Sequence, residues 1–439
     1  MTQSHPNPSG GHFKFGLDAP LPRFADLIRA NDQIVIGQAG AEPLSLTRAL
    51  VAQAQQLPPC RLFLGAVLSD TFESGLPVHL GLAGYGVMGR SVRAFSGSSG
   101  GVEGVLPTPY SGLEAAFESG RVRADVVLLQ LAPSRDGKRL SLGLAHDYVL
   151  AAARKARIVI AEINRHAPFT PNTETAVDFR IDHAVWCSEP PLDAPTIAAG
   201  ETEQRIAALI AQHVPDRATI QVGIGSLPDA VLGALAGHAG LGLHTGLVAD
   251  RVIELIEKGV IDNRWKGIDA GVSVSNCAGG TARLRAHLDG NPLFEVRPAA
   301  YTHSLLTLSQ VRRFHAINSA LEVDLTGQVN AEHDGRSWRG GLGGLGDFAR
   351  GARLSEGGRS IIALASTTRD GATSRIVLRV QRAQVTLGRG DADWVITEWG
   401  AADLRNTDLG TRAKRLIDIA HPAHRESLAR QWHDFARGG

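Results

Sequence analysis

The sequence predicts an α/β fold with two domains, each built on a mostly parallel β-sheet flanked by helices. Short apolar runs rich in Val, Ile and Leu recur along the chain, and segments with helical periodicity lie between them. Such runs are typical of strands buried on both faces of a parallel sheet, because crossover helices cover those faces. The length of 439 residues allows two or three domains, each with its own core.

The first half of the chain contains three predicted strands. The run at 33–37 (QIVIG) precedes a helical segment at 41–57, and the run at 125–133 (DVVLLQLAP) precedes another at 146–156. A strand at 157–164 follows that second helix directly. The alternation of strand and helix is the pattern of βαβ units.

A proline-rich segment without periodicity at 189–200 (EPPLDAPTIAAG) follows these elements. It is typical of a linker or a long crossover. We therefore expect an N-terminal domain over 1–190 and a C-terminal domain over 200–439.

The same alternation begins again after this segment. Helices are predicted at 201–214 and 229–237, on either side of a strand at 218–225 (ATIQVGIG). Further strands are expected at 360–367, 375–380 and 393–400.

The composition argues against several classes of protein. The 45 Lys and Arg residues against 44 Asp and Glu leave a net charge of +1, so nothing favours binding to nucleic acid or to a membrane surface. The three cysteines form no C-x-x-C pair, which argues against a disulfide framework and a zinc site. Segment 1–16 lacks the apolar core of a signal peptide, and no apolar run is long enough to span a membrane. We expect a soluble cytoplasmic protein without a metal site.

Two glycine-rich stretches are candidates for binding a ligand through the backbone. Gly223 and Gly225 form a turn between a predicted strand and a predicted helix, where N–H groups can approach an anion or an oxyanion. Similar turns often serve packing alone, and Pro228 interrupts the dinucleotide fingerprint. Segment 340–346 holds five glycines, a density that no helix or regular strand tolerates. A mobile loop over an active site fits this segment, and a merely exposed loop is the alternative.

Acidic side chains and one histidine are further candidates. Segment 316–332 is predicted to form strand, turn and strand, which places Glu322 and Asp324 on the same side. Buried carboxylates need partners or altered pKa values, so both are functional candidates, whereas an edge hairpin would leave them solvated. His244 lies in a predicted turn before a helix that Asp250 is expected to cap, where a structural role is the commoner one.

Taken in order, these stretches resemble the acetyl-CoA hydrolase/transferase family. The blocks that carry the resemblance are AEPLSLTRAL, SLGLAHDYVLAAARKARIVIAEIN, IQVGIGSLPDAVLGAL, AINSALEVDLTGQVNAE, DFARGARLSEGGRSIIALAST and VITEWGAADLRNTDLGTRAKRLIDIAHPAHRESL. They span nearly the whole chain. The resemblance implies two CoA-transferase-type domains with the active site between them. It also implies coenzyme A as a substrate rather than a bound cofactor, with an acyl-CoA and a small carboxylate as partners. We expect a homo-oligomer.

The resemblance implies a ping-pong reaction. A glutamate attacks the thioester and passes through an acyl-glutamyl anhydride and a glutamyl-CoA thioester, while glycine turns stabilise the oxyanions. The positions that match these oxyanion- and CoA-binding turns are Gly223, Ile224, Gly225, Gly341, Gly343 and Gly344.

Two positions depart from the family pattern. The catalytic glutamate usually lies in G-I-H-T-E-M-x-S-D-G, but this chain has GLHTGLVAD at 242–250, with Gly246 at the glutamate position. The glycine loop usually reads G-x-G-G-Q-x-D-F, and Leu345 replaces its polar amide. Glycine cannot form a thioester, so the usual nucleophile is absent.

Three functions remain open. In the favoured one, the protein transfers CoA or hydrolyses an acyl-CoA, and water or another carboxylate attacks. The candidates for that chemistry are Glu322, Asp324 and Asp347 as acidic groups and His244 as a base. In the second, the protein is a silent CoA-binding protein or regulatory subunit. In the third, the scaffold binds a ligand other than CoA, which the retained glycine turn and the Asp-Phe pair at 347–348 argue against.

Overall fold

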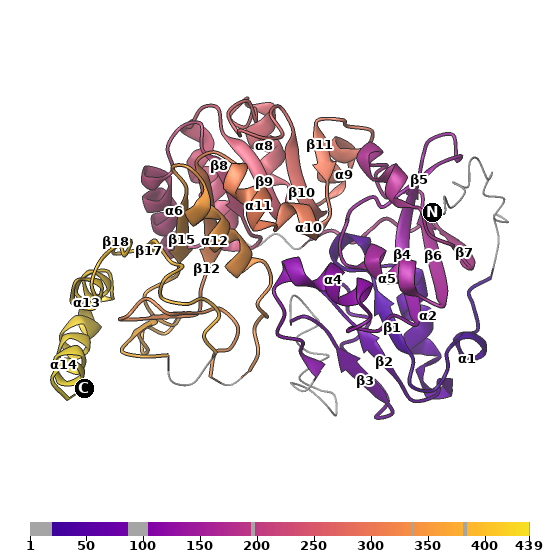
Figure 1. The fold of residues 1–439 in the computed structure, drawn as a ribbon, viewed down its shortest axis with the longest axis horizontal. Helices are drawn as coiled ribbons and strands as arrows, with labels where there is room; N and C mark the ends of the chain where they lie inside the picture. Colours follow the sequence, from indigo (N-terminus) through magenta and orange to yellow (C-terminus); the bar gives the residue numbers. More distant parts are fainter. Residues whose placement is uncertain (1–19, 87–103, 195–197, 336, 381–383, 439) are drawn as a thin grey trace, which may run out of the picture.

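The computed structural model of the chain describes residues 20–86, 104–194, 198–335, 337–380 and 384–438. Segment 1–16, for which no signal peptide was predicted, lies outside these residues. Two helix-flanked β-sheets lie next to each other, the first built from the first half of the chain and the second from the remainder (Figure 1). This arrangement confirms the predicted α/β fold with two mostly parallel sheets.

The first sheet has the strand order β3-β2-β1-β4-β6-β7, all parallel, with the short β5 antiparallel to β4. Its strands are β1 (Gln33–Ile36), β2 (Cys60–Phe63), β3 (Leu80–Ala83), β4 (Val126–Pro133), β5 (Leu140–Ser141), β6 (Ile158–Asn164) and β7 (His183–Cys187). The helices around it are α1 (Phe24–Leu27), η1 (Ala39–Ala41), α2 (Leu44–Ala52), η2 (Ala54–Gln56), η4 (Tyr110–Gly112), α4 (Leu113–Glu118), α5 (Val149–Lys155) and η5 (Pro171–Ala176). Strand β4 is buried along nearly its whole length, which explains its unbroken apolar sequence.

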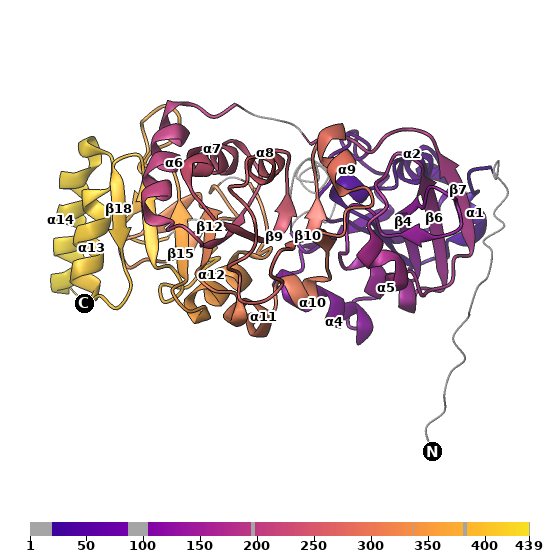
Figure 2. The same cartoon turned by 90° about the horizontal axis from the view of Figure 1, so that it is seen from above.

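The second sheet has the order β11-β10-β9-β8-β12-β15-β17-β18, parallel except for β18. Its strands are β8 (Thr219–Val222), β9 (Gly242–Val248), β10 (Ser273–Ala278), β11 (Phe294–Val296), β12 (Phe314–Ser319), β15 (Arg359–Ala363), β17 (Trp394–Thr397) and β18 (Gly400–Asp403). The helices of this half are α6 (Glu201–His213), α7 (Ser226–Ala234), η6 (Leu235–Gly237), α8 (Arg251–Glu257), α9 (Ala282–Leu288), α10 (Ala299–Thr302), α11 (Leu305–Gln310), α12 (Leu345–Leu354), α13 (Leu409–Asp418) and α14 (Pro422–Gly438). Helices α6, α7 and α8 cover one face of the sheet, and α11 and α12 cover the other (Figure 2).

Both sheets reverse their winding direction beside their first strand. In the first sheet, β2 and β3 lie on one side of β1, and β4, β6 and β7 lie on the other. In the second, β9, β10 and β11 lie on one side of β8, and β12, β15 and β17 on the other. Loops diverge above the carboxyl ends of the strands at such a switch point, so a ligand crevice is expected there.

Residues 242–248 form a strand, and the predicted turn there is wrong. Strand β9 contains His244 and Gly246, and it pairs in parallel with β10 through Val248 but with β8 only at Gly242 and Leu243. Pairing on both sides overrides the poor strand propensity of two glycines, which a sequence window does not show. Gly246 lies near the carboxyl end of β9, the neighbour of β8, and so close to the point where the sheet reverses its winding.

The acidic segment 316–332 contains the predicted strand, turn and strand, but its acidic strand joins a separate small sheet. Strand β12 belongs to the main sheet, whereas Glu322 and Asp324 lie in β13 (Glu322–Asp324) of a separate three-stranded sheet. Its other strands are β14 (Val329–Asn330), antiparallel to β13, and β16 (Ile376–Val377), parallel to it. The predicted strand at 375–380 is therefore present only as the short β16.

The glycine-rich segment is shorter as a loop than predicted. Helix α12 begins at Leu345, so of the five glycines at 340–346 only Gly346 lies in a helix and the other four precede it. Gly351 packs against Leu308 of α11, where a Cβ atom would lie 2.5 Å from Cδ1 of that leucine. Close packing between the two helices therefore favours a small residue at this position.

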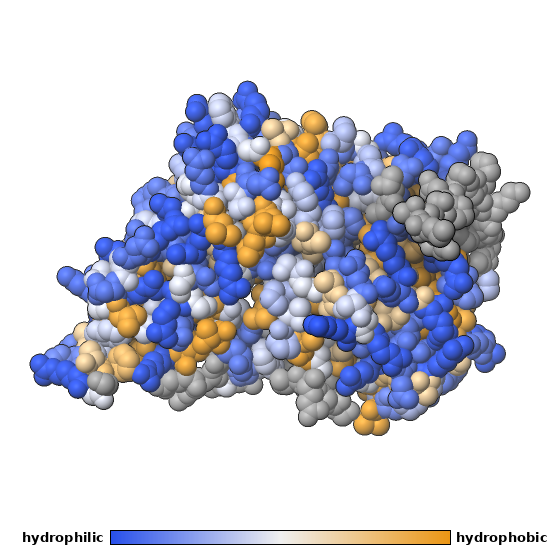
Figure 3. All heavy atoms as spheres, in the orientation of Figure 1, coloured by the Kyte–Doolittle hydropathy of each residue, from blue (hydrophilic) through white to orange (hydrophobic). Residues whose placement is uncertain are grey.

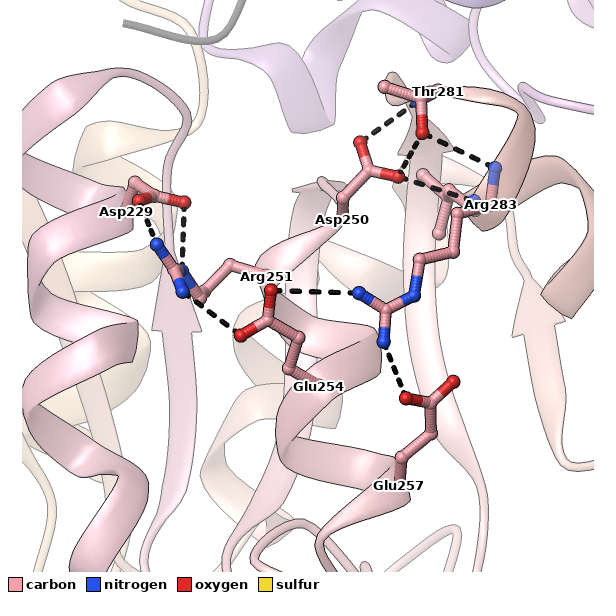
Figure 4. A network of polar contacts seen from close by, with 8 residues as sticks. Asp229, Asp250, Arg251, Glu254, Glu257, Thr281 and Arg283 are labelled. Atoms are coloured by element: carbon pink, nitrogen blue, oxygen red, sulfur yellow. Dashed lines mark hydrogen bonds and ion pairs between the residues drawn. The ribbon is translucent and has the colours of Figure 1, made fainter. Parts of the chain in front are cut away.

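Asp250 caps a different helix from the one predicted. It precedes α8 but has no side-chain hydrogen bond to it. Its carboxylate instead accepts hydrogen bonds from N (2.8 Å) and Oγ1 (2.7 Å) of Thr281, at the start of α9 (Figure 4). Beside it, Arg251 pairs with Asp229 of α7, and Arg283 of α9 pairs with Glu257 of α8. This network fixes α7, α8 and α9 to one another on one face of the second sheet.

Hydrophilic side chains cover most of the face shown in Figure 3, and the apolar ones form small separate groups. Leu306, which is 79% exposed, and Leu354, which is 60% exposed, are among the most exposed of the large apolar side chains. Among the described residues, the helices are all too short or too polar to cross a bilayer.

Candidate active site

A cavity of about 180 Å³ lies where the two halves of the chain meet. Its wall includes residues at the carboxyl ends of β8, β9, β10 and β12, together with residues that follow β1, β2 and β3. Both switch points therefore contribute to it. A larger groove of about 900 Å³ lies between the loop after β4 and helix α9. We place the site in the smaller cavity because the glycine turns and both switch points converge there.

A buried chain of hydrogen bonds joins the two halves at the cavity wall. Tyr85 donates its hydroxyl to Oε1 of Gln38 (2.7 Å), and Nε2 of Gln38 donates to the hydroxyl of Tyr110 (2.7 Å). Tyr110 in turn donates to Oδ1 of Asn276 on β10 (3.0 Å). Burial raises the pKa of Tyr110 well above its ordinary value, so this hydroxyl stays protonated. The chain holds the facing walls at a fixed separation.

The glycine loop is fastened to the first half of the chain. The amide of Tyr110 donates to the carbonyl of Gly343 (2.9 Å). A Cβ atom on Gly86 would lie 2.5 Å from Cα of Gly341, so the two backbones approach too closely for side chains. Gly343 has φ = +50°, which favours glycine. The loop is thus closed over the cavity in this conformation.

Gly246 opens directly onto the cavity. It lies in an extended strand without a positive φ, so the backbone itself accepts any residue. A Cβ atom there would lie 3.1 Å from Nε2 of His303 and 3.3 Å from Cε2 of Phe348. The neighbouring Thr245 donates its hydroxyl to the carbonyl of Val222 (2.9 Å), which ties β9 to the end of β8. The space beside Gly246 is thus occupied mainly by an imidazole.

Comparisons with known proteins place this geometry in a family. A model of the acetyl-CoA hydrolase/transferase C-terminal domain matches residues 280–432. The 4-hydroxybutyrate coenzyme A transferase of Clostridium kluyveri is 34% identical over 408 residues, which cover 92% of this chain and 94% of that protein. The chain belongs to the acetyl-CoA hydrolase/transferase family.

Three further proteins are similar to the chain in structure or in sequence. The structure of a 4-hydroxybutyrate CoA-transferase from Porphyromonas gingivalis is 30% identical with a TM-score of 0.76, and the alignment covers 93% of this chain and 95% of that one. RipA from Yersinia pestis is 29% identical with a TM-score of 0.84 over the same shares. An acetyl-CoA hydrolase of Candida albicans is 31% identical over 223 residues, which cover 48% of this chain and 39% of that protein. The predicted CoA-transferase-type fold and the resemblance are confirmed.

Within this CoA-transferase-type fold, some of the predicted glycine positions line the cavity and others lie outside its wall. Gly223, Gly343 and Gly344 line the cavity. Gly225 has φ = +121° and precedes helix α7, and Ile224 is 41% exposed beside it. A backbone with positive φ explains the glycine at 225, whereas a Cβ atom on Gly223 would only touch Cγ of Pro228, at 4.0 Å.

The predicted acidic residues lie outside the described cavity wall. Asp347 accepts hydrogen bonds from N (3.1 Å) and Oγ (2.8 Å) of Ser111 and so links α12 to the first half. Burial raises the pKa of Asp347, and the bonds from Ser111 oppose that rise. Glu322 lies in the small sheet, where burial raises its pKa as well. Their proposed reactive roles stay predictions.

His244 lies behind the cavity wall. Its ring is fully buried, and Nε2 lies 2.9 Å from the carbonyl of Thr302, at the end of α10. Burial lowers the pKa of His244 to about 3, so the ring is neutral and Nε2–H donates to that carbonyl. This contact fixes the turn that carries His303. A direct role of His244 as a base stays a prediction.

His303, Gln38, Tyr110 and Asn276 are the side chains that sequence reasoning missed. None stands in a motif that indicates chemistry, and Gln38 and His303 are far apart in the sequence. The end of strand 33–37 was a usable indication for Gln38, because residues at the carboxyl end of a parallel strand lie near ligands. For His303 the sequence offered no comparable indication.

Glu114 lies outside the cavity wall and has a strongly shifted pKa. On α4, it accepts hydrogen bonds from the amides of Ala299 (2.6 Å) and Ala300 (3.4 Å), at the start of α10. Burial raises its pKa from 4.5 to about 7 against the opposing effect of these bonds, with smaller contributions from Asp147 and Glu118. The folded state therefore binds the proton more tightly than the unfolded state.

We expect this excess proton affinity to make wild-type stability fall with rising pH. Since the folded pKa is the higher one, the contribution is fully present below about pH 4.5 and is lost as the pH rises through about 7. Relative to Glu114→Gln, the wild type should lose about 1–2 kcal/mol of unfolding free energy over this window, after allowance for partial exposure. Urea unfolding of both proteins at several pH values measures the difference. Parallel pH curves for the two proteins would contradict it.

Proposed function

We propose that the protein binds an acyl-CoA in the cavity between the two sheets and hydrolyses its thioester. CoA transfer to a carboxylate is the second form of the same activity. The observation that carries this proposal is the position of Gly246, on the cavity wall between the two glycine turns that match the family's oxyanion-binding segments. The two sheets are proposed to mark domains over 1–190 and 200–439.

The composition of the wall favours hydrolysis over transfer. Among the described residues lining the cavity there is no carboxylate, and the family glutamate position holds Gly246. Double displacement needs a side chain that is first acylated and then carries CoA. Hydrolysis needs only a positioned water molecule and donors for the oxyanion. Backbone amides near Gly223 and Gly344 are the proposed donors. Glu322 and Asp347 are the proposed alternatives as nucleophiles.

Names of relatives support both forms of the activity. The Clostridium kluyveri relative is a CoA transferase, and the Candida albicans relative is an acetyl-CoA hydrolase. A silent CoA-binding protein is the alternative that Leu345 favours, because an apolar side chain lines the cavity where the family has a polar amide.

Release of free CoA thiol from acyl-CoA tests the proposal. Acetyl-CoA, butyryl-CoA and succinyl-CoA are each incubated with the protein with and without acetate as acceptor. We expect thiol release that does not depend on acetate, and no transfer of label from acetate into acyl-CoA. Calorimetry with CoA reports binding separately. Binding without turnover would favour the silent protein, and the absence of both would contradict any CoA function.

A further inference from the structure

The imidazole of His303 fills the space that a side chain at position 246 would enter. A Cβ atom on Gly246 would lie 3.1 Å from Nε2 and 3.3 Å from Cε1 of His303. A Cβ atom on Gly344 would lie 2.6 Å from the same Nε2. Gly246 and Gly344 both line the cavity, so Nε2 lies between two bare stretches of its wall. A side chain at 344 would collide with the ring, and one at 246 would require the ring to shift.

Aromatic neighbours hold the ring in this place. The ring centroid of His303 lies 4.4 Å from that of Phe348 and 4.8 Å from that of Tyr110. Tyr110 is in turn fixed by its hydrogen bonds to Gln38 and Asn276. The imidazole is thus pre-positioned by residues from both halves of the chain, as a catalytic group requires.

Hydrogen bonding assigns the tautomer. The hydroxyl of Thr302 donates to the carbonyl of Pro298 (3.2 Å), and Oγ1 of Thr302 lies 2.8 Å from Nδ1 of His303. With its proton on Pro298, Oγ1 accepts from Nδ1–H, and Nε2 carries a lone pair. In the described part of the chain, Nε2 has no hydrogen-bond partner, so this lone pair is available to a molecule in the cavity.

We infer that His303 replaces the missing glutamate as the catalytic group, and that its Nε2 acts as general base toward a water molecule that attacks an acyl-CoA thioester. The inference rests on the proposed function and specifies its mechanism. The absence of a side chain at 246 then leaves room for both the imidazole and the water.

In the unliganded cavity the ring is neutral but only weakly basic. Burial lowers the pKa of His303 to about 3, and His244 contributes in the same direction. The imidazole is therefore neutral at physiological pH and is able to accept a proton. Its basicity rises during the reaction, because the negative charge that develops on the thioester oxygen stabilises an adjacent imidazolium.

The step balances as an ordinary hydrolysis. The water oxygen forms a bond to the thioester carbon while Nε2 takes one water proton, and the carbonyl π electrons move to the oxygen. When the tetrahedral intermediate collapses, the carbon–sulfur bond breaks and the CoA thiolate receives the proton from Nε2. The products are a carboxylic acid, which ionises in solvent, and the CoA thiol.

Cys277 is the other nucleophilic group of this wall. Burial raises the pKa of its thiol well above the ordinary value, and Sγ donates to Oδ1 of Asn276 (3.1 Å). A protonated thiol engaged in a hydrogen bond is a poor nucleophile. The geometry therefore favours His303.

Thiol release by the full-length protein, measured for wild type, His303→Gln and His303→Ala, tests the inference. We expect His303→Gln to lower kcat by about 10²–10⁴-fold while CoA affinity stays within about threefold. Free imidazole should restore part of the activity of His303→Ala, which a merely structural role would not explain. The matched control is His315→Gln, which changes a buried histidine outside the cavity wall and should retain kcat within about twofold.

Single turnover in H₂¹⁸O identifies the attacking group. Direct attack by water places one ¹⁸O in the released carboxylate and none in the protein. Label in Glu322 or Asp347, or full activity of a folded His303→Gln variant alongside active wild type, would overturn the role of His303 but not the hydrolase activity. Wild type that binds CoA without hydrolysing any ester would overturn both the role and the enzymatic proposal. Absence of CoA binding as well would overturn the CoA function itself.

Discussion

Gly246→Glu combined with His303→Asn is expected to give CoA-transferase activity at least about fivefold above that of Gly246→Glu alone. The extended backbone of β9 accepts glutamate, but its Cβ would lie 3.1 Å from Nε2 of His303. Such crowding costs about 1–3 kcal/mol, equivalent to roughly a 5–150-fold change in rate. The shorter Asn removes the clash. Exchange of labelled acetate into acyl-CoA measures the activity of each variant.

Leu345 is expected to limit the CoA-transferase activity of the variant that combines Gly246→Glu and His303→Asn. Its apolar side chain lines the same cavity, so it desolvates a carboxylate at 246 and raises the pKa of that group. Adding Leu345→Gln should therefore increase exchange further. Gly246→Gln with His303→Asn is the matched control, since it has nearly the same shape without a carboxylate and should stay inactive.

Mass spectrometry supplies the covalent evidence for this prediction. A CoA thioester should be found on residue 246 of the active variants and nowhere on that residue in wild type. If the folded triple variant shows neither exchange nor adduct, the cavity does not hold the thioester against β9, and the proposed orientation of the substrate is wrong.

Asp324→Ala is expected to destabilise the second half of the chain by about 3–5 kcal/mol. The fully buried carboxylate accepts hydrogen bonds from N (2.9 Å) and Oγ1 (2.7 Å) of Thr326 and from N (3.0 Å) and Nε2 (2.9 Å) of Gln328. Removing it leaves these donors unpaired in a buried turn, at about 1–3 kcal/mol for each group that water cannot reach. The turn also needs Gly327, which has φ = +95°.

Urea unfolding followed by circular dichroism measures this loss. Asp324→Asn keeps one oxygen acceptor and should lose about half as much. The control Glu356→Ala changes an exposed carboxylate that lies 3.5 Å from Arg312, and it should change stability by less than about 0.5 kcal/mol. If Asp324→Ala were as stable as the wild type, Asp324 would not organise the turn. It would then again be a candidate for a catalytic role.

Much of the fold follows from local sequence. The apolar runs at 33–37, 125–133 and 157–164 are strands β1, β4 and β6, because continuous apolar sequence is stable as a strand when helices bury both of its faces. The strand at 242–248 escaped prediction. Its two glycines lower local propensity, and pairing with β10 and β8 supplies the stability that local sequence lacks.

The surroundings of the carboxylates also could not be predicted from local sequence. Period-two spacing correctly placed Glu322 and Asp324 in one short strand, but spacing does not reveal which sheet the strand joins. Asp324 accepts hydrogen bonds from the turn that follows it, and Asp347 accepts them from Ser111 in the other half of the chain. Partners of this kind decide whether a buried acid is structural or reactive.

The sequence by itself determined the α/β class, the family and the absence of a side chain at 246. Each of these depends on residue identity at ordered positions or on the periodicity of one segment. Only the tertiary structure decided that His303 fills the space beside Gly246 and that Tyr110 and Gln38 hold the opposite wall. The physical reason is that the wall of this cavity is built by side chains from segments that are distant in the sequence. Those contacts depend on how the two sheets pack, and no local pattern encodes them.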